Sequence, residues 1–273
     1  MSISSVEFEY LRKLMAEHTA IVLDPGKEYI AESRLAQLVV KEGFPSIGEL
    51  IRTLRAKSFN GLHRRVVNAM TNNETWFFRD LLPFQALRAQ VLPSLMSARA
   101  AHRNLAIWSA ACSSGQEPYT IAMLLREDFP ECRTWNLQLL ATDVSATVLE
   151  RAQNGHYSQL EVNRGLPAPL LTRYFRREGL DWVITDEVRR MVEFRLFNLA
   201  ETWREFPVCD VIFLRNVLIY FSVEMKKTIL ARVRGALKPD GCLFLGGAES
   251  TFNLDDRFER IQYETTSYYR LRA

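Results

Sequence analysis

The sequence predicts an all-helical N-terminal domain followed by an α/β domain built on a parallel sheet. Three observations support this prediction. Apolar residues in the first hundred positions recur at the helical spacing i, i+3, i+4. From Asn104 onward, short apolar runs alternate with helical segments, which is typical of strands covered by helices on both faces. The chain has 273 residues, enough for one or two domains at about 150 residues each.

The N-terminal helices are indicated by their periodicity and by the residues that bound them. An apolar face runs from Phe8 to Met15, and a second helix lies between Pro25-Gly26 and Gly43-Phe44-Pro45. Ser46-Ile-Gly-Glu49 resembles a capping box that opens a third helix, and Gly61 to Met70 forms a fourth. We expect a helical domain over 1–75, a linker helix over 76–104 and the α/β domain over 105–273.

Short apolar runs mark the candidate strands of the α/β domain. They are 105–109, 137–141, 194–197, 211–214 and 243–245. The helices predicted between them are 118–127, 145–152 and 222–237. A weakly alternating stretch at about 166–193 indicates a small β insertion, and the segments 258–262 and 267–271 predict an antiparallel hairpin at the sheet edge.

Composition excludes several classes of protein. Hydrophobic residues make up 48% and charged residues 25%, which is ordinary for a globular protein and argues against disorder and membrane insertion. No apolar run approaches about 18 residues, and the first residues lack the pattern of a signal peptide. We therefore expect a cytoplasmic protein. The net charge of +3 is too small to indicate nucleic-acid binding by itself.

Cysteine and histidine usage argues against disulfides and metal chemistry. The four cysteines contain no C-x-x-C, so buried free thiols are the expected state. No two of the four histidines stand at ligand spacing. We expect no metal cofactor.

Two loops after predicted strands carry candidate ligand-binding residues. The loop Ala110-Ala-Cys-Ser-Ser-Gly115 is followed at once by a helix, as at the nucleotide site of a Rossmann-like sheet. Gly115 alone does not make a pyrophosphate clamp, so a ligand without phosphates, presented to Glu117, fits better. Asp143 follows the second strand, where a carboxylate can accept both hydroxyls of a ribose. A ligand-free tight turn and a helix N-cap remain the alternatives for the loop and for Asp143.

Two further segments combine polar and aromatic residues. In Thr71-Asn-Asn-Glu-Thr-Trp-Phe-Phe-Arg-Asp80, three consecutive aromatic residues cannot all face one core, so some must line a pocket or a seam. Arg215 and Asn216 stand at the carboxyl end of the fourth strand, where open α/β sheets place ligands. Tyr220 follows one turn later, and an ordinary core tyrosine remains the alternative there.

These segments together resemble the signatures of the bacterial chemotaxis receptor methyltransferases of the CheR type. The resemblance covers essentially the whole chain, including the helical part. The segments that carry it are Asn73-Glu-Thr-Trp-Phe-Phe-Arg79, Ser109-Ala-Ala-Cys-Ser-Ser-Gly-Gln-Glu-Pro-Tyr119, Ala141-Thr-Asp143 and Leu214-Arg-Asn-Val-Leu-Ile-Tyr-Phe221.

The resemblance implies a seven-stranded methyltransferase sheet, S-adenosylmethionine as cofactor, S-adenosylhomocysteine as product, and glutamate side chains of receptor cytoplasmic helices as substrate. Gly246-Gly-Ala-Glu-Ser250 departs from the family pattern, and we assign it no role. Carried over by motif, the cofactor-binding residues are Asn73, Thr75, Arg79, Glu117, Asp143, Asn198, Leu199, Arg215 and Asn216.

The implied chemistry needs little catalytic apparatus. A glutamate with a pKa near about 4.3 is already ionised at neutral pH, so no general base is required. Alignment of the two substrates alone can contribute on the order of 7–11 kcal/mol. Arg79 and Tyr220 are the candidate catalytic residues, with Arg215 beside them, because they can place groups around the transferred methyl.

Two features bear on how a receptor is recognised. Residues 51–73 contain five basic residues and no Asp or Glu, so Arg52, Arg55, Arg64 and Arg65 are candidates for docking a glutamate-rich helix. A solvated basic surface is the alternative. Some relatives grip a receptor's C-terminal pentapeptide with the β insertion, but here the stretch from Gly179 to Val192 is short. We therefore expect no pentapeptide binding, and recruitment to membrane receptor arrays through the receptor's cytoplasmic domain.

Two other functions remain open at this point. One is a nucleic-acid methyltransferase on the same sheet, although the fourth strand ends in Arg215-Asn-Val-Leu and lacks an Asn/Asp-Pro-Pro-Tyr/Phe motif. The other is a non-catalytic module that binds the nucleoside and signals to a partner.

Overall fold

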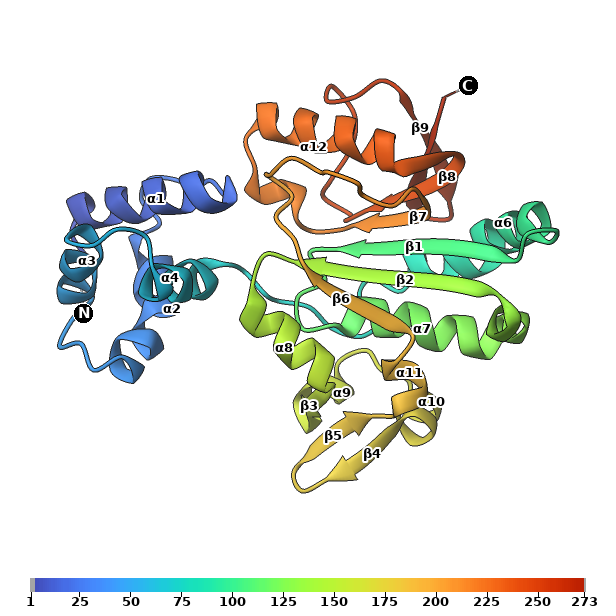
Figure 1. Ribbon diagram of the computed structural model, residues 1–273, viewed down its shortest axis with the longest axis horizontal. Coiled ribbons are helices and arrows are strands. Elements are labelled where there is room, and N and C mark those ends of the chain that lie inside the picture. Colours follow the sequence, from blue (N-terminus) through green and yellow to red (C-terminus); the bar gives the residue numbers. More distant parts are fainter. Residues whose placement is uncertain (1–2, 273) are drawn as a thin grey trace. The chain divides into compact units, whose positions relative to one another are not determined.

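The computed structural model describes residues 3–272, which form two compact units (Figure 1). The first contains residues 3–72 and Tyr220–Met225. The second contains Asn73–Ile219 and the residues from Lys226 onward. The predicted linker 76–104 forms α5 (Leu82–Ala86), a π-helical turn (Leu87–Val91) and α6 (Leu92–Arg99). Its apolar side chains, such as Phe84 and Leu87, are part of the core of the second unit.

The first unit is helical, as predicted. Its helices are α1 (Ser5–Thr19), α2 (Glu28–Lys41), α3 (Ile47–Arg55) and α4 (Gly61–Met70). The predicted box at Ser46 and Glu49 is only half formed, because the Ser46 side chain accepts from the Glu49 N–H while the Glu49 carboxylate binds Arg52 instead. Buried leucine, isoleucine and valine side chains from all four helices form one core.

The second unit is built on a seven-stranded sheet in the order β6-β2-β1-β7-β8-β10-β9 (Figure 1). Its strands are β1 (Asn104–Ala110), β2 (Asn136–Asp143), β6 (Val192–Leu196), β7 (Cys209–Leu214), β8 (Leu237–Leu245), β9 (Phe258–Tyr263) and β10 (Thr266–Leu271). The first five run parallel, and β10 is antiparallel to both β8 and β9. The predicted terminal hairpin is thus confirmed.

Helices accompany this sheet as the alternation predicted. Figure 1 shows α7 and α8 along its β2–β6 side and α12 along its β7–β8 side. The helices are α7 (Gln116–Asp128), α8 (Ala146–Asn154) and α12 (Val223–Ala236), with 3-10 turns at Pro130–Thr134 and Leu218–Tyr220. β8 is longer than predicted. It begins directly after α12 and contains a register shift opposite Cys209 and Val211.

The β insertion is a separate three-stranded antiparallel sheet in the order β3-β5-β4. It recruits a strand from before the predicted stretch, because His156–Ser158 pairs with Asp181–Val183. Its elements are β3 (His156–Ser158), α9 (Gln159–Asn163), α10 (Ala168–Tyr174), β4 (Phe175–Glu178), β5 (Asp181–Ile184) and α11 (Asp186–Arg189). Tyr157, Phe175 and Ile184 attach the insertion to the core of the large sheet.

Three further findings concern residues 3–272. None of their helices combines the length and apolar character needed to cross a bilayer. The four cysteines within this range are buried free thiols. No group of three His, Cys, Asp or Glu side chains in this range is arranged to hold a metal ion.

Candidate cofactor site

The candidate site lies at the carboxyl ends of β1, β2 and β7. The chain passes from β1 to β2 on one side and later returns to place β7 on the other side of β1. Open α/β sheets bind ligands in the crevice beside such a reversal of strand order. Residues that follow all three strands meet here, since the Ser113 N–H donates to Asp143 at 2.9 Å and Arg215 bonds Glu117 at 2.9 Å.

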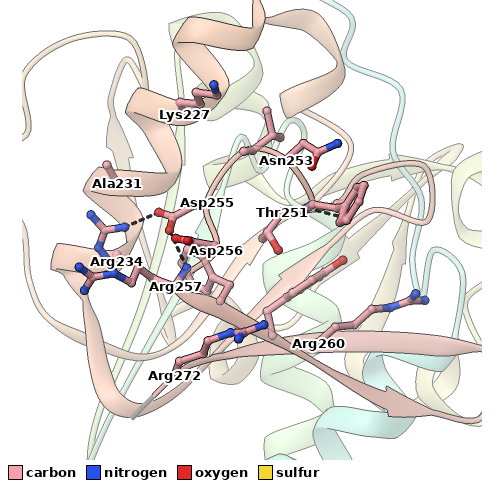
Figure 2. Close-up of a pocket in the computed structure, with 15 residues that line it drawn as sticks. Lys227, Ala231, Arg234, Thr251, Asn253, Asp255, Asp256, Arg257, Arg260 and Arg272 are labelled. Carbon is pink, nitrogen blue, oxygen red and sulfur yellow. Dashed lines mark hydrogen bonds and ion pairs between the residues drawn. The ribbon is translucent and has the colours of Figure 1, made fainter.

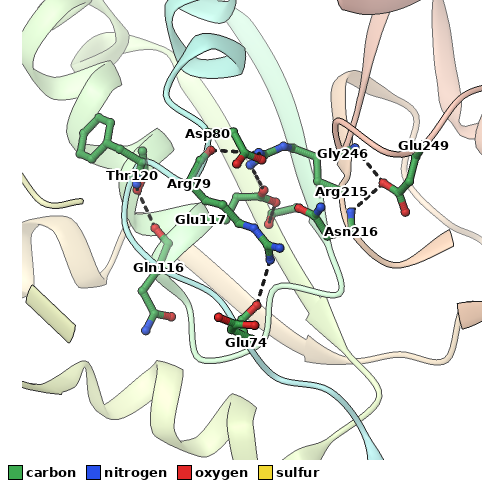
Figure 3. Close-up of polar contacts among 12 residues, drawn as sticks. Glu74, Arg79, Asp80, Gln116, Glu117, Thr120, Arg215, Asn216, Gly246 and Glu249 are labelled. Carbon is green, nitrogen blue, oxygen red and sulfur yellow. Dashed lines mark hydrogen bonds and ion pairs between the residues drawn. The ribbon is translucent and has the colours of Figure 1, made fainter. Parts of the chain in front are cut away.

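Arg215 is the centre of a buried charge cluster, drawn in Figure 3. Only 1% of its side chain is exposed. One terminal nitrogen bonds Glu117 Oε2 at 2.9 Å, and the other bonds Asp80 Oδ2 at 2.8 Å and the Arg79 carbonyl at 2.9 Å. Two carboxylates around one guanidinium leave an excess of negative charge. The cluster is therefore suited to a cationic group of a ligand.

Glu117 stands in the first turn of α7, where the helix dipole favours an anion. Ser109 Oγ donates to its Oε1 at 2.8 Å, and Arg215 donates to its Oε2. An ionised carboxylate offers about four acceptor positions, so Glu117 keeps capacity for a ligand ammonium or hydroxyl.

Asp143 ends β2 and is buried. Its two oxygens accept from the backbone N–H groups of Ser113 and Ser145, each at 2.9 Å. Burial raises the pKa of this carboxyl, and the backbone hydrogen bonds oppose that shift. The N-cap of α8 is Ser145, so Asp143 is not the cap itself. It joins the loop after β1 to the loop after β2 and keeps lone pairs for hydroxyl groups.

The loops after β1 and β7 contain residues with left-handed backbone. Ala111, Ser113 and Asn216 have φ values of 53°, 51° and 58°. Gly115, with φ 92°, precedes α7, and a Cβ there would lie 2.9 Å from Ala152 Cβ. Non-glycine residues in this region cost roughly 1–3 kcal/mol each and are typical of binding sites.

The three consecutive aromatic side chains, 76–78, lie in different environments, as their sequence predicts. Phe77 is fully buried and packs edge-on against Tyr157 and Phe175, whereas Phe78 is half-buried beside Phe84. Trp76 is half-buried. The guanidinium carbons of two arginines lie over its ring, Arg79 at 4.4 Å and Arg164 at 3.9 Å from the centroid.

Arg79 is held by this aromatic contact and by one hydrogen bond. Its Nη1 donates to the Glu74 carbonyl at 2.9 Å, while the Glu74 carboxylate pairs with Arg164 at 2.9 Å. Arg164 belongs to the segment that follows α9. The small β insertion therefore contributes to the position of Arg79.

Glu249 is a residue of the site that we did not predict. One of its oxygens accepts from the N–H groups of Asn216 and Gly246, both at 2.7 Å (Figure 3). The other oxygen accepts from the N–H groups of Val217 at 2.9 Å and Ile219 at 3.3 Å. A Cβ on Gly246 would lie 2.5 Å from Asn216 Nδ2. The segment to which we assigned no role thus shapes the loop that carries Arg215 and Asn216. The sequence signal that could have identified Glu249 is its position as the first acidic residue after β8, the fifth parallel strand.

The remaining predicted cofactor residues have more ordinary surroundings. The Asn73 carbonyl accepts from Ser113 Oγ at 2.8 Å, which joins the aromatic segment to the loop after β1. Asn198 Oδ1 accepts from the Ala200 N–H at 3.0 Å, and Leu199 is buried. Phe197, next to Asn198, donates its N–H to the Asp143 carbonyl. Thr75 is half-buried.

Tyr220 is grouped with the helical unit. Its carbonyl accepts from the Val22 N–H at 2.8 Å, and Phe221 forms an isolated bridge with Ile21. Asn72 Nδ2 donates to the Tyr220 hydroxyl at 2.5 Å. Because that contact uses the oxygen as an acceptor, the phenolic proton remains available to donate.

The four predicted docking arginines are all exposed on the helical unit. Two of them make ion pairs, Arg52 with Glu49 at 2.6 Å and Arg65 with Glu42 at 2.8 Å. Exposed pairs of this kind are weak, about 0–1 kcal/mol, so they leave these side chains able to exchange partners.

The fold and the residues at the carboxyl ends of β1, β2 and β7 are typical of α/β proteins that bind a nucleoside-like ligand, and a helical unit precedes them. Comparison with known families is more specific. A model described as CheR methyltransferase, SAM binding domain, matches residues 73–267, and one described as CheR methyltransferase, all-alpha domain, matches residues 6–71.

Curated relatives match along the whole chain. Chemotaxis protein methyltransferase 1 of Pseudomonas aeruginosa is 42% identical over 275 residues, 99% of each chain. Chemotaxis protein methyltransferase Cher2 of Pseudomonas putida is 41% identical over 96% of each chain. The chemotaxis protein methyltransferase of Salmonella typhimurium is 34% identical over 94% of this chain and 88% of its own. The chain therefore belongs to the CheR methyltransferase family, and it is an S-adenosylmethionine-dependent methyltransferase.

The residues of the crevice fit this cofactor. Glu117 and Asp143 are carboxylates with unused lone pairs, as the ammonium and the ribose hydroxyls require. Buried polar atoms near them lack partners, namely Arg79 Nε, Ser145 Oγ, Arg215 Nε and Asn216 Oδ1. Buried polar groups are normally hydrogen-bonded, so such a concentration is typical of a site that a polar ligand completes.

Proposed function

We propose that this protein methylates glutamate side chains on the cytoplasmic helices of chemotaxis receptors. The observation that carries the proposal is the match over almost the full length of both chains to proteins named chemotaxis protein methyltransferases. The charge cluster around Arg215 supports it from the structure, because it provides carboxylates for the cofactor.

In this proposal the crevice residues hold the cofactor from several sides. Glu117 accepts from the ammonium group, Asp143 accepts from the ribose hydroxyls, and Asn198 and Leu199 border the adenine. Arg215 holds Glu117 in place, and Glu249 holds the backbone of Asn216. Asn73, Thr75 and Arg79 close the site through the aromatic segment, which Ser113 Oγ fastens to the loop after β1.

S-adenosylmethionine supplies an electrophilic methyl group, which passes to a carboxylate oxygen while the bonding electron pair stays on sulfur. The receptor glutamate needs no base, since its pKa of about 4.3 leaves it ionised at neutral pH. The work of the protein is to orient that carboxylate. We assign this to the Arg79 guanidinium, held over Trp76, and to the Tyr220 hydroxyl, whose proton is free to donate.

We also propose a division of labour between the two units. The helical unit docks the receptor through Arg52, Arg55, Arg64 and Arg65, and the α/β unit carries out the transfer. The protein then works at membrane receptor arrays, through the receptor's cytoplasmic domain and without contact to nucleic acid. The short hairpin of β4 and β5 supports our expectation that no receptor pentapeptide binds there.

The transfer assay tests the proposal directly. The protein is incubated with radiolabelled S-adenosylmethionine and receptor-rich membranes, and we expect base-labile label in the receptor band, as for a glutamate methyl ester. An Asp143→Ala variant should give no label, while Arg133→Glu, at an exposed position outside the site, should match the wild type. Label in nucleic acid, or base-stable label, would contradict the proposal.

Tyr220→Phe tests the role of the hydroxyl. We expect kcat to fall by roughly 10²-fold, the scale of one positioned donor, with the cofactor Kd unchanged. Steady-state kinetics and titration calorimetry measure the two quantities. Loss of cofactor binding in this variant would show that Tyr220 supports the cofactor site instead.

Charge reversal tests the docking surface. Arg64→Glu, alone and combined with Arg55→Glu, should raise the KM for receptor by several-fold and flatten its dependence on salt, because steering falls with lost charge. Arg133→Glu serves again as the matched control. An unchanged KM and salt dependence would assign these arginines to a solvated surface.

A further inference from the structure

A second polar hollow in the α/β unit is separate from the residues of the cofactor site. It has a volume of about 1110 Å³ and lies between α12, the loop 250–257 and the β9–β10 hairpin (Figure 2). Lys227 and Arg234 are on the helix, and across from it Arg260 is on β9 and Arg272 directly follows β10. We call this hollow the α12 groove.

The α12 groove concentrates positive charge. Five cationic and two anionic side chains line it, an excess of three that equals the net charge of +3 of the whole chain. Only Arg234 is neutralised, by Asp255 at 2.5 Å. Arg260 donates to Ser267 Oγ, a neutral partner. Within residues 3–272, the side chains of Lys227, Arg257 and Arg272 form no hydrogen bond or ion pair.

The wall between these cations is preformed. The Thr251 carbonyl accepts from the N–H groups of Leu254 and Asp255, both at 3.0 Å. Ser250 Oγ accepts from the Phe252 N–H, and Asp255 Oδ1 accepts from the Arg257 N–H, each at 3.0 Å. The loop thus needs no ordering on binding, while its cations are left for an external anion.

The same hydrogen bonds indicate what kind of anion fits. Phosphate sites usually aim several free backbone N–H groups at the ligand, and here four N–H groups of the loop are already used. The cations are spread along two walls, since Lys227 and Arg234 are two helical turns apart, roughly 10 Å. Phe252, 79% exposed, adds an apolar contact of the kind that protein interfaces use, and Arg is enriched there as well. An extended row of carboxylates fits these features better than a compact phosphate.

We propose that the α12 groove docks an acidic segment of a partner protein, bound through Arg257, Arg260, Arg272 and Lys227. This extends the proposed function, under which the glutamate-rich receptor is the partner that supplies the segment. The groove would then hold the substrate protein on the catalytic unit, in addition to the basic face of the helical unit.

Binding of poly-L-glutamate tests the groove without relying on transfer activity. We expect the full-length protein to bind this probe, and Arg272→Glu and Arg257→Glu each to weaken binding by about three- to tenfold at low salt, with a smaller effect at high salt. Arg133→Glu, a charge reversal at an exposed position outside the groove, should leave the affinity unchanged. All three variants should keep the wild-type cofactor Kd, and this measurement checks that they are folded. If Arg272→Glu does not fold, Arg257→Glu provides the test.

Three outcomes would overturn the proposal. Equal affinity in the groove variants and the wild type places the acidic segment elsewhere, and equal loss in Arg133→Glu indicates a nonspecific charge effect. Tighter binding of tripolyphosphate than of poly-L-glutamate, lost in Arg272→Glu, makes the groove a phosphate site. With a soluble receptor fragment, Arg272→Glu should raise KM and leave kcat unchanged. The two proposals can be told apart. If the wild type methylates no receptor while poly-L-glutamate binding still depends on Arg272, the proposed receptor methylation is contradicted and the proposed docking of an acidic segment in the α12 groove is supported.

Discussion

The two ends of the parallel sheet both hold clusters of charged side chains, and the cluster around Asp210 at the amino end has its hydrogen bonds satisfied. There Asp210, which is fully buried, accepts from Arg99 Nε and Lys238 Nζ at 2.9 Å and from the Ala106 N–H at 2.8 Å. The two terminal nitrogens of Arg99 donate to the Asp240 carboxylate at 2.6 and 2.9 Å. This end has the geometry that a buried ion pair needs in order to offset its desolvation.

The carboxyl end buries a similar cluster and leaves part of it unsatisfied. Arg215 binds Glu117 and Asp80, yet Arg215 Nε, Arg79 Nε and Asn216 Oδ1 have no hydrogen-bond partner. Left-handed residues are also gathered here. The two clusters therefore differ in their hydrogen bonds: the cluster around Asp210 is complete, whereas the cluster around Arg215 keeps unpaired polar atoms that a ligand can use.

The pKa shifts follow the same division. At the amino end, the hydrogen bond from Arg99 lowers the pKa of Asp240. At the carboxyl end, burial raises the pKa of Asp143. Folding thus favours the ionised form of Asp240 at the amino end and disfavours the ionised form of Asp143 at the carboxyl end.

Arg215→Ala should have the largest effect. It leaves the buried Glu117 uncompensated, so we expect a loss of about 3–5 kcal/mol in the free energy of unfolding, together with loss of cofactor binding. Asp210→Ala, at the other end, should destabilise on a similar scale and leave the cofactor Kd of the folded protein unchanged. Urea unfolding and titration calorimetry measure both. Cofactor binding lost equally in the two variants would remove the distinction between the ends.

Glu249→Gln should have an intermediate effect confined to the carboxyl end. Four backbone N–H groups lose a charged acceptor, and the side-chain NH₂ now faces donors. We expect the cofactor Kd to rise about tenfold, equivalent to about 1.4 kcal/mol. Glu259→Gln, at an exposed position on β9, is the control and should bind as the wild type does. If both variants bind equally well, Glu249 does not shape the site.

Asp240→Asn should have the smallest effect, visible only through pH. Because the folded-state pKa of Asp240 lies below its usual value, the ion pair stabilises the protein above about pH 4, and this contribution is lost as the pH falls through the folded-state pKa. Half of the Asp240 side chain is exposed, so we expect less than about 1 kcal/mol. Urea unfolding at pH 7 and pH 3 should show a difference from the wild type that is smaller at pH 3 than at pH 7. A difference as large at pH 3 as at pH 7 would contradict this account.

Periodicity predicted the main elements of the fold because it depends on local burial. The alternation of short apolar runs with helices placed the strands of the parallel sheet, and the terminal hairpin was correct as well. Local patterns failed where a distant partner decided the outcome. β3 joined the insertion because His156–Ser158 pairs with residues 25 positions further on, at Asp181–Val183. The Glu49 carboxylate does not complete the capping box because it binds Arg52 instead.

The sequence by itself determined which chemical groups are available and on which elements they stand. Glu117, Asp143, Arg215 and Asn216 each follow a strand or open a helix, and parallel strands bring their carboxyl ends to one edge. Only the tertiary structure decided how these groups are paired, since Glu249 is 33 positions from Asn216 and Arg79 depends on a contact made through Trp76 with Arg164. Hydrogen bonds and ion pairs act over a few ångströms in space, whatever the separation along the chain, so which residues meet became known only when the chain was folded.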